Sequence, residues 1–197
     1  MPLGDLKSDA ELVRSLQCGN RQALGTLYDR YKHKVYHTAF AITGDPDVAA
    51  DLLQDVFLRL FRYSKTIDPT RQLEPWLYRV TTNLCYTWMK SQRRWLNPLE
   101  DIADWFTGAE NNSLSQALLI DEEWLQVQKA VSALPAAQRM VVVLHYLNDL
   151  SIEEISATLD VPIGTVKSRL HYGRETLKKH LLGSQGEAFS SLGCEFT

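Results

Sequence analysis

Apolar residues recur every three to four positions along most of the chain, which is the spacing of one face of an α-helix. In the first half this spacing predicts helices at 8–19, 20–44, 45–63 and 75–94, with a loop at 64–74. Ser8 followed by Glu11 forms a capping box, and Asp45-Pro46 combines a capping carboxylate with a proline at the first helical position. No stretch alternates apolar and polar residues for long enough to predict a strand.

Apolar stripes on the second and third predicted helices indicate the core of this first half. On the second helix the stripe consists of Leu24, Leu27, Tyr28, Tyr31, Val35 and Phe40. On the third helix it consists of Val48, Leu52, Val56, Leu60 and Phe61. We therefore expect these helices to pack side by side as a bundle.

The helical pattern stops from residue 96 to about residue 120, where Asn97-Pro98 and Gly108 indicate an irregular segment. It returns in predicted helices at 121–133, 135–147, 151–159 and 162–182. The sequence therefore predicts an all-α fold made of two small helical domains. The expected boundaries are a first domain at 1–95, an irregular acidic linker at 96–120, a second domain at 121–183 and a flexible tail at 184–197.

The last two predicted helices have the signature of a helix-turn-helix. A capping box of Ser151 and Glu154 opens the first of them, and Asp160-Val161 is a tight turn. The second helix has an apolar stripe of Val166, Leu170, Leu177 and Leu181, with Gly173 where we expect close packing. Its other face offers hydrogen-bond donors from Lys167, Ser168, His171, Tyr172, Arg174 and Lys178. This pattern predicts a recognition helix that enters the major groove of DNA, although several classes of regulator share the motif.

Charge is distributed unevenly along the chain, and this changes what the net charge of −3 implies. Residues 59–94 hold eight basic and two acidic groups, and residues 162–182 hold five basic groups and one acidic group. Between them, residues 95–125 hold seven acidic groups and no basic one. Two basic blocks that each end a helical unit favour a nucleic-acid partner, which the overall charge alone would not suggest.

Membrane and disulfide chemistry are disfavoured by the composition. No apolar run approaches the roughly 20 residues of a membrane span, and the N-terminal segment lacks the regions of a signal peptide. We therefore expect a cytoplasmic protein with no membrane insertion. The three cysteines are far apart, so we expect no disulfide framework and no zinc site, and we expect Cys18 and Cys85 to be small apolar fillers.

Three segments together resemble the extracytoplasmic-function (ECF) sigma factors of the sigma-70 family. DLLQDVFLRLFR at 51–62 resembles the polymerase-binding helix of that family, and WLYRVTTN at 76–83 resembles its promoter-melting signature. ALPAAQRMVVVLHYLNDLSIEEIS, followed by VPIGTVKSRL, resembles its last domain. The order and spacing of all three are more specific than any one segment.

The resemblance implies a role for each part of the chain. Core RNA polymerase would bind Asp51, Gln54, Asp55 and Arg59. The loop 63–74 and the following helix would open the −10 promoter element, with contacts from Trp76, Arg79, Asn83, Lys90, Arg93 and Arg94. Residues at the −35 element would be Arg139, Thr165, Lys167, Ser168, His171, Tyr172, Arg174 and Lys178, with Arg139 at the DNA backbone. The linker would pass through polymerase, and an anti-sigma factor is an expected partner.

The residues also fit these roles physically. Asn83 offers both a donor and an acceptor to an unstacked base, and Trp76, Tyr78 and Trp88 supply aromatic surface, although we expect Trp76 mainly in the core. The sequence departs from the family at Thr87, where an acidic residue is common, at Lys90, where arginine is common, and at Tyr172, where a basic residue is frequent. These departures affect which promoter is read and leave the fold expectation unchanged.

Other function classes explain fewer of these features. A helix-turn-helix regulator with a ligand-sensing first domain would not account for both 51–62 and 76–83, and a polymerase-binding adaptor would not need a basic recognition helix. His33 and His37 lie four residues apart and could bind a metal, but without a nearby Cys/His cluster a surface or packing role is favoured. We expect no enzyme activity, no catalytic residue, no cofactor and no metal, since no phosphate loop or nucleophile motif is present.

Overall fold

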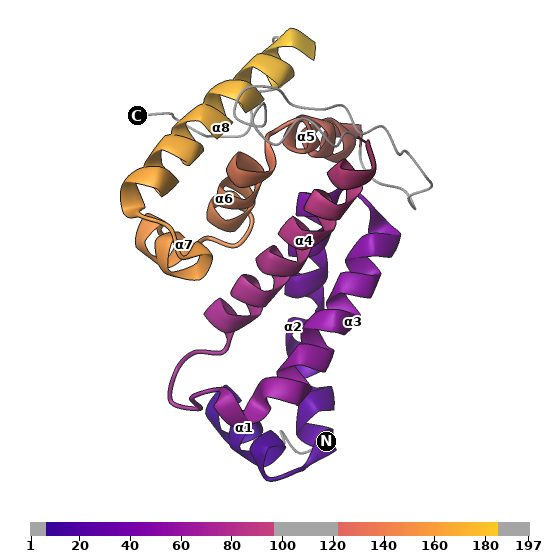
Figure 1. The fold of residues 1–197 in the computed structure, drawn as a ribbon, viewed down its shortest axis with the longest axis vertical. Helices are drawn as coiled ribbons and strands as arrows, with labels where there is room; N and C mark the ends of the chain where they lie inside the picture. Colours follow the sequence, from indigo (N-terminus) through magenta and orange to yellow (C-terminus); the bar gives the residue numbers. More distant parts are fainter. Residues whose placement is uncertain (1–6, 97–121, 185–197) are drawn as a thin grey trace.

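The computed structural model describes residues 7–96 and 122–184, and every element in these ranges is helical (Figure 1). The elements are α1 (Asp9–Gln17), α2 (Arg21–Thr43), α3 (Pro46–Tyr63), the 3-10 turn η1 (Ser64–Thr66), α4 (Glu74–Leu96), α5 (Glu122–Ser132), α6 (Ala136–Tyr146), α7 (Ile152–Leu159) and α8 (Ile163–Ser184). Residues 97–121 and 185–197, which include most of the predicted linker and tail as well as Cys194, lie outside the described residues.

The helices begin and end where the local sequence signals predict. The Ser8 hydroxyl accepts a hydrogen bond from the Glu11 amide while the Glu11 carboxylate accepts one from the Ser8 amide, which completes the capping box. The Asp45 carboxylate accepts hydrogen bonds from the amides at 47 and 48, and Pro46 follows at the first helical position. Gly44 ends α2 with a φ of 76°, a left-handed conformation that glycine adopts without strain. These boundaries confirm the sequence prediction.

Helices α1 to α4 form the first domain around one apolar core. On α3 the buried face includes Leu53 and Phe57 together with the predicted Val56 and Leu60. The prediction was wrong for Phe61, whose side chain is 42% exposed. Phe61 lies about 100° around the helix from Leu60 and about 40° beyond Phe57, so it falls past the edge of the buried face.

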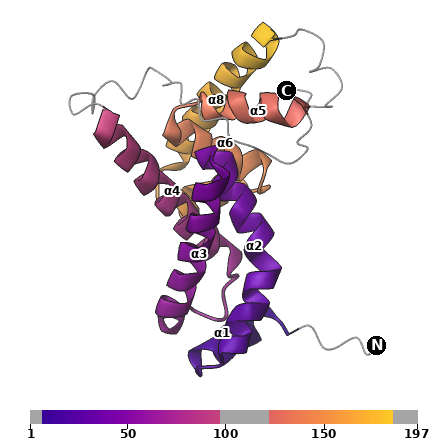
Figure 2. The same ribbon diagram turned by 90° about the vertical axis from the view of Figure 1, so that its right-hand side faces the viewer.

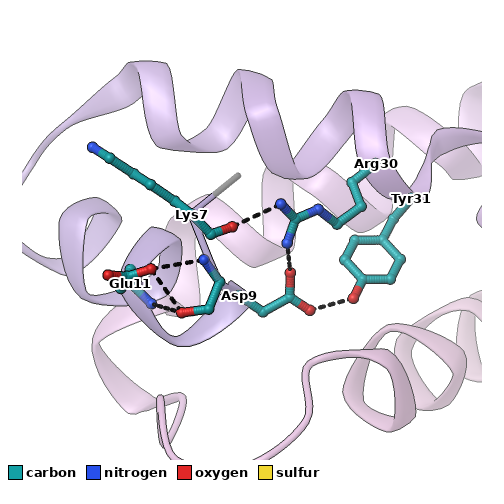
Figure 3. A network of polar contacts seen from close by, with 6 residues as sticks. Lys7, Asp9, Glu11, Arg30 and Tyr31 are labelled. Atoms are coloured by element: carbon teal, nitrogen blue, oxygen red, sulfur yellow. Dashed lines mark hydrogen bonds and ion pairs between the residues drawn. The ribbon is translucent and has the colours of Figure 1, made fainter. Parts of the chain in front are cut away.

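A polar network fixes the first helix to the second (Figure 3). The Asp9 carboxylate accepts hydrogen bonds from the Arg30 guanidinium and from the Tyr31 hydroxyl, and Arg30 also donates to the Lys7 carbonyl over 2.8 Å. Burial, and secondarily the hydrogen bond to Asp9, raises the pKa of the Tyr31 hydroxyl, so Tyr31 stays protonated and donates. The start of α1 is thereby held against the middle of α2.

Helices α5 to α8 form the last domain, and its core confirms the expected helix-turn-helix. Ile155 of α7 and Val166 of α8 are fully buried together, and Leu170 of α8 joins them. At Gly173 a Cβ atom would lie 2.7 Å from Val142 Cγ2 of α6. This distance is shorter than two carbon atoms tolerate, so the predicted close packing at Gly173 is confirmed.

The two domains pack against each other. Helix α2 contacts α5 and α6, and α4 contacts α6 and α7; Figure 2 shows α5 and α6 beside the upper end of α2. Apolar side chains cross the boundary in both directions, because Met140 and Val143 of α6 belong to the core of the first domain while Tyr78 of α4 belongs to the core of the last. We call this contact the packed arrangement. The sequence indicated two domains and a linker, but not this contact.

Membrane and cysteine expectations can be compared with the described residues. None of the helices that the structure describes is both long enough and apolar enough to cross a bilayer. Cys85 is fully buried in the first core, as a filler should be, and burial raises the pKa of its thiol to about 12. The expectation was wrong for Cys18, which is exposed at the end of α1.

Candidate nucleic-acid interface

Helix α8 presents a continuous polar face to solvent. The side chains of the predicted −35 set that are exposed are Lys167, Ser168, His171, Tyr172 and Lys178. Thr165 and Arg174 are half-buried on the same helix. The helix packs through its other face on α5, α6 and α7. The structure therefore brings seven of the eight predicted residues together on one helix.

The turn before α8 sets the direction of that helix. Asp160 adopts a left-handed conformation with a φ of 56°, and the Ser156 hydroxyl donates to the Val161 carbonyl over 2.6 Å. At the other end of α7, hydrogen bonds from the amide and hydroxyl of Ser151 lower the pKa of the Glu154 carboxyl. Glu154 is therefore ionised at neutral pH and caps α7. Caps at both ends give α7 a defined length, and so place α8 at a defined angle.

Arg139 lies at the domain boundary, apart from the other predicted −35 residues. Its guanidinium donates to the Ile42 carbonyl of α2 over 2.7 Å, and to the carbonyls of Ser132 and Leu134. Nearby, the Gln128 amide donates to the Phe40 carbonyl over 3.1 Å. The last carbonyls of a helix lack partners within that helix and carry its negative dipole end, so a cation from the last domain stabilises the end of α2.

Helix α4 carries the predicted −10 residues on its exposed side. Asn83 and Lys90 are exposed, and Arg79 is 51% exposed. Tyr86, which the sequence reasoning missed, is exposed on the same face, three residues after Asn83 and four before Lys90. That spacing was the available signal. Arg93 and Arg94 belong to α4, but their side chains lie outside the described residues.

The structure buries the aromatic residues of α4 to different extents. Trp76 is half-buried and packs against the core of the first domain, whereas Tyr78 is 3% exposed and lies among the core residues of the last domain. The Tyr78 hydroxyl donates to Glu74 over 2.9 Å, and Glu74 also pairs with Lys34 over 2.5 Å. Burial, and then the hydrogen bond to Glu74, raises the pKa of Tyr78. Tyr78 therefore joins the domains in the packed arrangement.

Two polar contacts between the domains accompany the burial of Tyr78. Arg79 Nη2 lies 3.6 Å from the Asp160 carboxylate in the helix-turn-helix turn. Asn148 donates to the Thr38 hydroxyl of α2 over 2.9 Å. In the packed arrangement the last domain thus covers Tyr78 and engages the neighbouring Arg79.

The segment between α3 and α4 is a short loop with a fixed base. The predicted loop contains η1 at its start, and Ile67 and Leu73 are buried on either side of residues 68–72, which are exposed except for the half-buried Pro69. Within the tip, the amide and hydroxyl of Thr70 donate to the Asp68 carboxylate, which lowers the pKa of that carboxyl. The loop thus presents a defined, solvent-facing tip immediately before α4.

The predicted polymerase-binding residues lie on the exposed face of α3. Asp51, Gln54, Asp55 and Arg59 are all exposed. Leu58, which the sequence reasoning did not select, is 60% exposed among them. A large apolar side chain within a polar face has the form of an interface anchor with a polar rim. The sequence did contain a signal for Leu58, because it lies four residues after Gln54 and three after Asp55, which places it on the same face of the helix.

The chemistry of these faces suits binding. The exposed faces of α4 and α8 present cations, amides, hydroxyls and aromatic rings, which are the groups that contact phosphates and unstacked bases. The His33 and His37 rings stack with their centroids 6.4 Å apart. Within residues 7–96 and 122–184, no group of three His, Cys, Asp or Glu side chains is arranged to hold a metal ion.

Comparison with known families matches both halves of the chain. The family model for sigma-70 region 2 matches residues 27–94, which cover α2 to α4 apart from the first residues of α2 and the last of α4. The family model for sigma-70 region 4 matches residues 124–177, which run from α5 into α8.

Curated proteins and solved structures agree with these matches. The ECF RNA polymerase sigma-E factor of Escherichia coli K12 is 30% identical over 178 residues, which cover 86% of this chain and 92% of that protein. The ECF RNA polymerase sigma factor SigW of Bacillus subtilis is 29% identical over 180 residues, covering 86% and 94%. CnrH, solved with the cytosolic domain of CnrY, has a TM-score of 0.65 at 21% identity, covering 91% of this chain and 99% of that one. RpoE of Bartonella quintana, solved with the anti-sigma factor NepR, has a TM-score of 0.65 at 23% identity, covering 80% and 96%.

Proposed function

The chain belongs to the ECF sigma factors of the sigma-70 family, and from this premise we propose which of its surfaces bind polymerase and promoter DNA. As such a factor, it directs core RNA polymerase to specific promoters and initiates transcription. We divide the work between a first domain at 1–95 and a last domain at 121–183, joined by the linker at 96–120 and followed by the tail at 184–197. The two family matches fall within these two domains.

The exposed face of α3 binds core polymerase. Its predicted contact residues are Asp51, Gln54, Asp55 and Arg59, and we add Leu58 as the apolar anchor among them. These side chains leave the core undisturbed, so a partner can engage them without unfolding the domain.

The loop 63–74 and α4 open the −10 element. Arg79, Asn83 and Lys90 share the exposed side of α4, and Tyr86 adds an aromatic surface on which a base can stack. Arg93 and Arg94 follow in the same helix, and their charges suit contact with phosphates. We assign Trp76 a supporting role, because its side chain is half-buried at the start of α4.

Helix α8 reads the −35 element in the major groove. The observation that carries this assignment is the exposed face formed by Lys167, Ser168, His171, Tyr172 and Lys178. Arg174 and Thr165 flank that face, and Arg139 reaches the DNA backbone only if it leaves the α2 carbonyl that it now contacts.

The packed arrangement must open before both elements are bound. Elements centred near −10 and −35 lie about 25 base pairs apart, which is about 85 Å along DNA at roughly 3.4 Å per base pair. A compact chain of this length has a radius of gyration of only about 16 Å. Two faces within one such body cannot reach both elements, so polymerase binding has to separate the two domains.

A paired substitution on α3 tests the polymerase-binding face. Gln54→Ala combined with Asp55→Lys should weaken core-polymerase binding by roughly tenfold or more, the effect expected of interface hot spots. Thermal stability should change little, because both side chains are exposed. Asp29→Lys on α2 is the matched control, since Asp29 is exposed and lies on another helix. Unfolding of the double variant, or unchanged affinity, would show that this face does not bind polymerase.

The acidic linker would occupy the nucleic-acid channel of polymerase. Its carboxylates repel DNA phosphates but suit a channel with basic walls. They include Glu100, Asp101, Asp104 and Glu110, all outside the described residues. Replacing each glutamate of this set by glutamine and each aspartate by asparagine should weaken holoenzyme formation and alter the yield of short abortive transcripts. If the variant and the parent give the same abortive transcripts, the linker only connects the two domains.

Three further assignments follow from the family. We propose that the chain is not an enzyme, that it acts in the cytoplasm beside the polymerase, and that an anti-sigma factor regulates it. Support for the last comes from the similar fold of RpoE, which was solved with the anti-sigma factor NepR.

A further inference from the structure

We propose that Gln17 is a positioning residue for promoter opening, because its side chain holds the base of the loop before α4 in one conformation. This proposal rests on the proposed function, in which the loop 63–74 contacts the −10 element. The sequence pattern indicates no role for α1, but in the structure its last residue contacts residues about 50 positions away in the chain.

A single side-chain amide bridges both ends of the 3-10 turn. Gln17 Nε2 donates to the Ser64 carbonyl over 3.0 Å and to the Ile67 carbonyl over 2.8 Å. The Ile67 amide in turn donates to the Ser64 carbonyl over 3.1 Å. Both contacts of Gln17 are partly buried, so water cannot easily replace them.

These contacts fix where the exposed loop tip begins. Ile67 is the last buried residue before the tip and Leu73 is the first buried residue after it. With Ile67 held by Gln17, and with Leu73 in the core at the start of α4, the five residues between them have little freedom. A loop that is already ordered loses less conformational entropy when it captures DNA, so it binds more tightly and opens the duplex faster.

Helix α1 is anchored well enough to serve as the support for Gln17. Leu12, Val13 and Leu16 are buried in the first core. At the other end of α1, the Asp9 carboxylate is held by Arg30 and Tyr31 of α2, as the dashed lines in Figure 3 show. The two ends of α1 thus connect the middle of α2 to the base of the loop.

A set of substitutions separates hydrogen bonding from packing. Gln17→Met keeps the length and shape of the side chain but removes both N–H donors, whereas Gln17→Lys keeps a donor for the two carbonyls. Gln22→Met makes the same chemical change at an exposed position of α2 and is the matched control. A positioning role predicts that Lys restores function and Met does not. A packing role predicts the reverse.

The measurement uses holoenzyme and a promoter that it transcribes, with 2-aminopurine replacing an adenine on the non-template strand of the −10 element. Fluorescence of this base rises when it leaves the stack, so it reports opening directly. Gln17→Met should slow opening by roughly tenfold, which is the effect of losing one to two hydrogen bonds. Gln17→Lys should recover most of the rate, and Gln22→Met should match the parent. Binding to duplex −35 DNA and to core polymerase should be unchanged.

A variant of the loop tip separates failure of this inference from failure of the proposed function. Arg71→Ala combined with Gln72→Ala alters the exposed tip directly. If the tip variant slows opening but Gln17→Met opens at the parent rate, Gln17 does not position the loop, and the inference is overturned. If the tip variant also opens at the parent rate, the loop does not contact the −10 element, and the proposed function of the loop fails. If Met and Lys are equally slow, Gln17 only supports folding, and a matching loss of thermal stability would identify that role.

Discussion

Helices α4 and α8 carry the two proposed DNA-binding faces, but only α4 is partly covered by the other domain. Helix α8 packs on its own domain and leaves its polar face in solvent. Helix α4 has Tyr78 buried in the core of the other domain, and Arg79 beside Asp160. The recognition helix is thus ready for DNA in the packed arrangement, whereas the melting helix becomes fully available only when the domains separate. Substitutions that act on one helix and spare the other test whether the two helices differ in this way.

The largest expected effect comes from Tyr78→Ala. Removing a buried aromatic side chain costs about 3–5 kcal/mol in a rigid core, and less where water can enter. We expect a lower melting temperature and a larger radius of gyration by X-ray scattering, since Tyr78 joins α4 to the last domain. Tyr86→Ala, at an exposed position of the same helix, is the control and should change neither quantity. A Tyr78 variant as compact and stable as the control would show that Tyr78 does not join the domains.

Next in size is Gly173→Ala, which acts on α8 alone. The added Cβ would lie 2.7 Å from Val142 Cγ2, so α8 and α6 must move apart, at a cost of about 1–3 kcal/mol. Chemical denaturation measures this loss, and duplex −35 binding should weaken with it. Gly25→Ala on α2 is the matched control, because nothing lies within 4 Å of its added Cβ and alanine favours a helix by about 0.5–1 kcal/mol. Equal stabilities for the two variants would contradict the close packing of α6 and α8.

Lys178→Ala tests whether the open face of α8 contacts phosphates. Each phosphate contact contributes about 0.9 to the slope of log affinity against log salt. We expect duplex binding to weaken at all sequences and the slope to fall by about one. The same change at Lys32, which is paired with Asp29 on α2, should leave the slope unchanged. Loss of affinity for one sequence only would instead assign Lys178 to base reading.

The smallest effect should come from Asp160→Asn, which removes the charge that faces Arg79. Both side chains are largely exposed, so the pair contributes at most about 1 kcal/mol. Asparagine tolerates the left-handed conformation at this position, so the turn itself should persist. We expect unchanged thermal stability and a slightly larger open population, measured by fluorescence energy transfer between the domains. A loss of several degrees in melting temperature would mean that the carboxylate has another structural role.

Sequence alone predicted the helices because their signals are local. The capping boxes at Ser8 and Ser151, and the Asp45-Pro46 start, act within one helical turn, and each is present in the structure. Residues of α8 were also brought together correctly, since a single helix fixes their relative positions.

Contacts between distant parts of the chain could not be predicted in the same way. Nothing in the spacing of α4 distinguishes Trp76 from Tyr78, and only the position of the last domain buries the second. Likewise, a basic residue at position 139 fits a phosphate as well as it fits the carbonyl of Ile42 that it contacts. The edge of a buried helix face was also hard to predict. An apolar stripe shows which side of a helix is buried, but it does not show how wide the buried face is, and Phe61 lies just outside that face.

The most direct test is to lock the packed arrangement and then measure promoter-specific transcription. In a variant with Cys18→Ser and Cys194→Ser, Thr38→Cys and Asn148→Cys would place two thiols where side chains of the two domains now share a hydrogen bond. We expect the oxidised protein still to bind duplex −35 DNA through α8, but to give no transcripts with core polymerase. Reduction of the same protein should restore transcripts from discrete start sites. Equal transcription from the locked form would contradict the requirement for opening, and absence of discrete transcripts from the reduced form and the parent would contradict the assignment as an initiation factor.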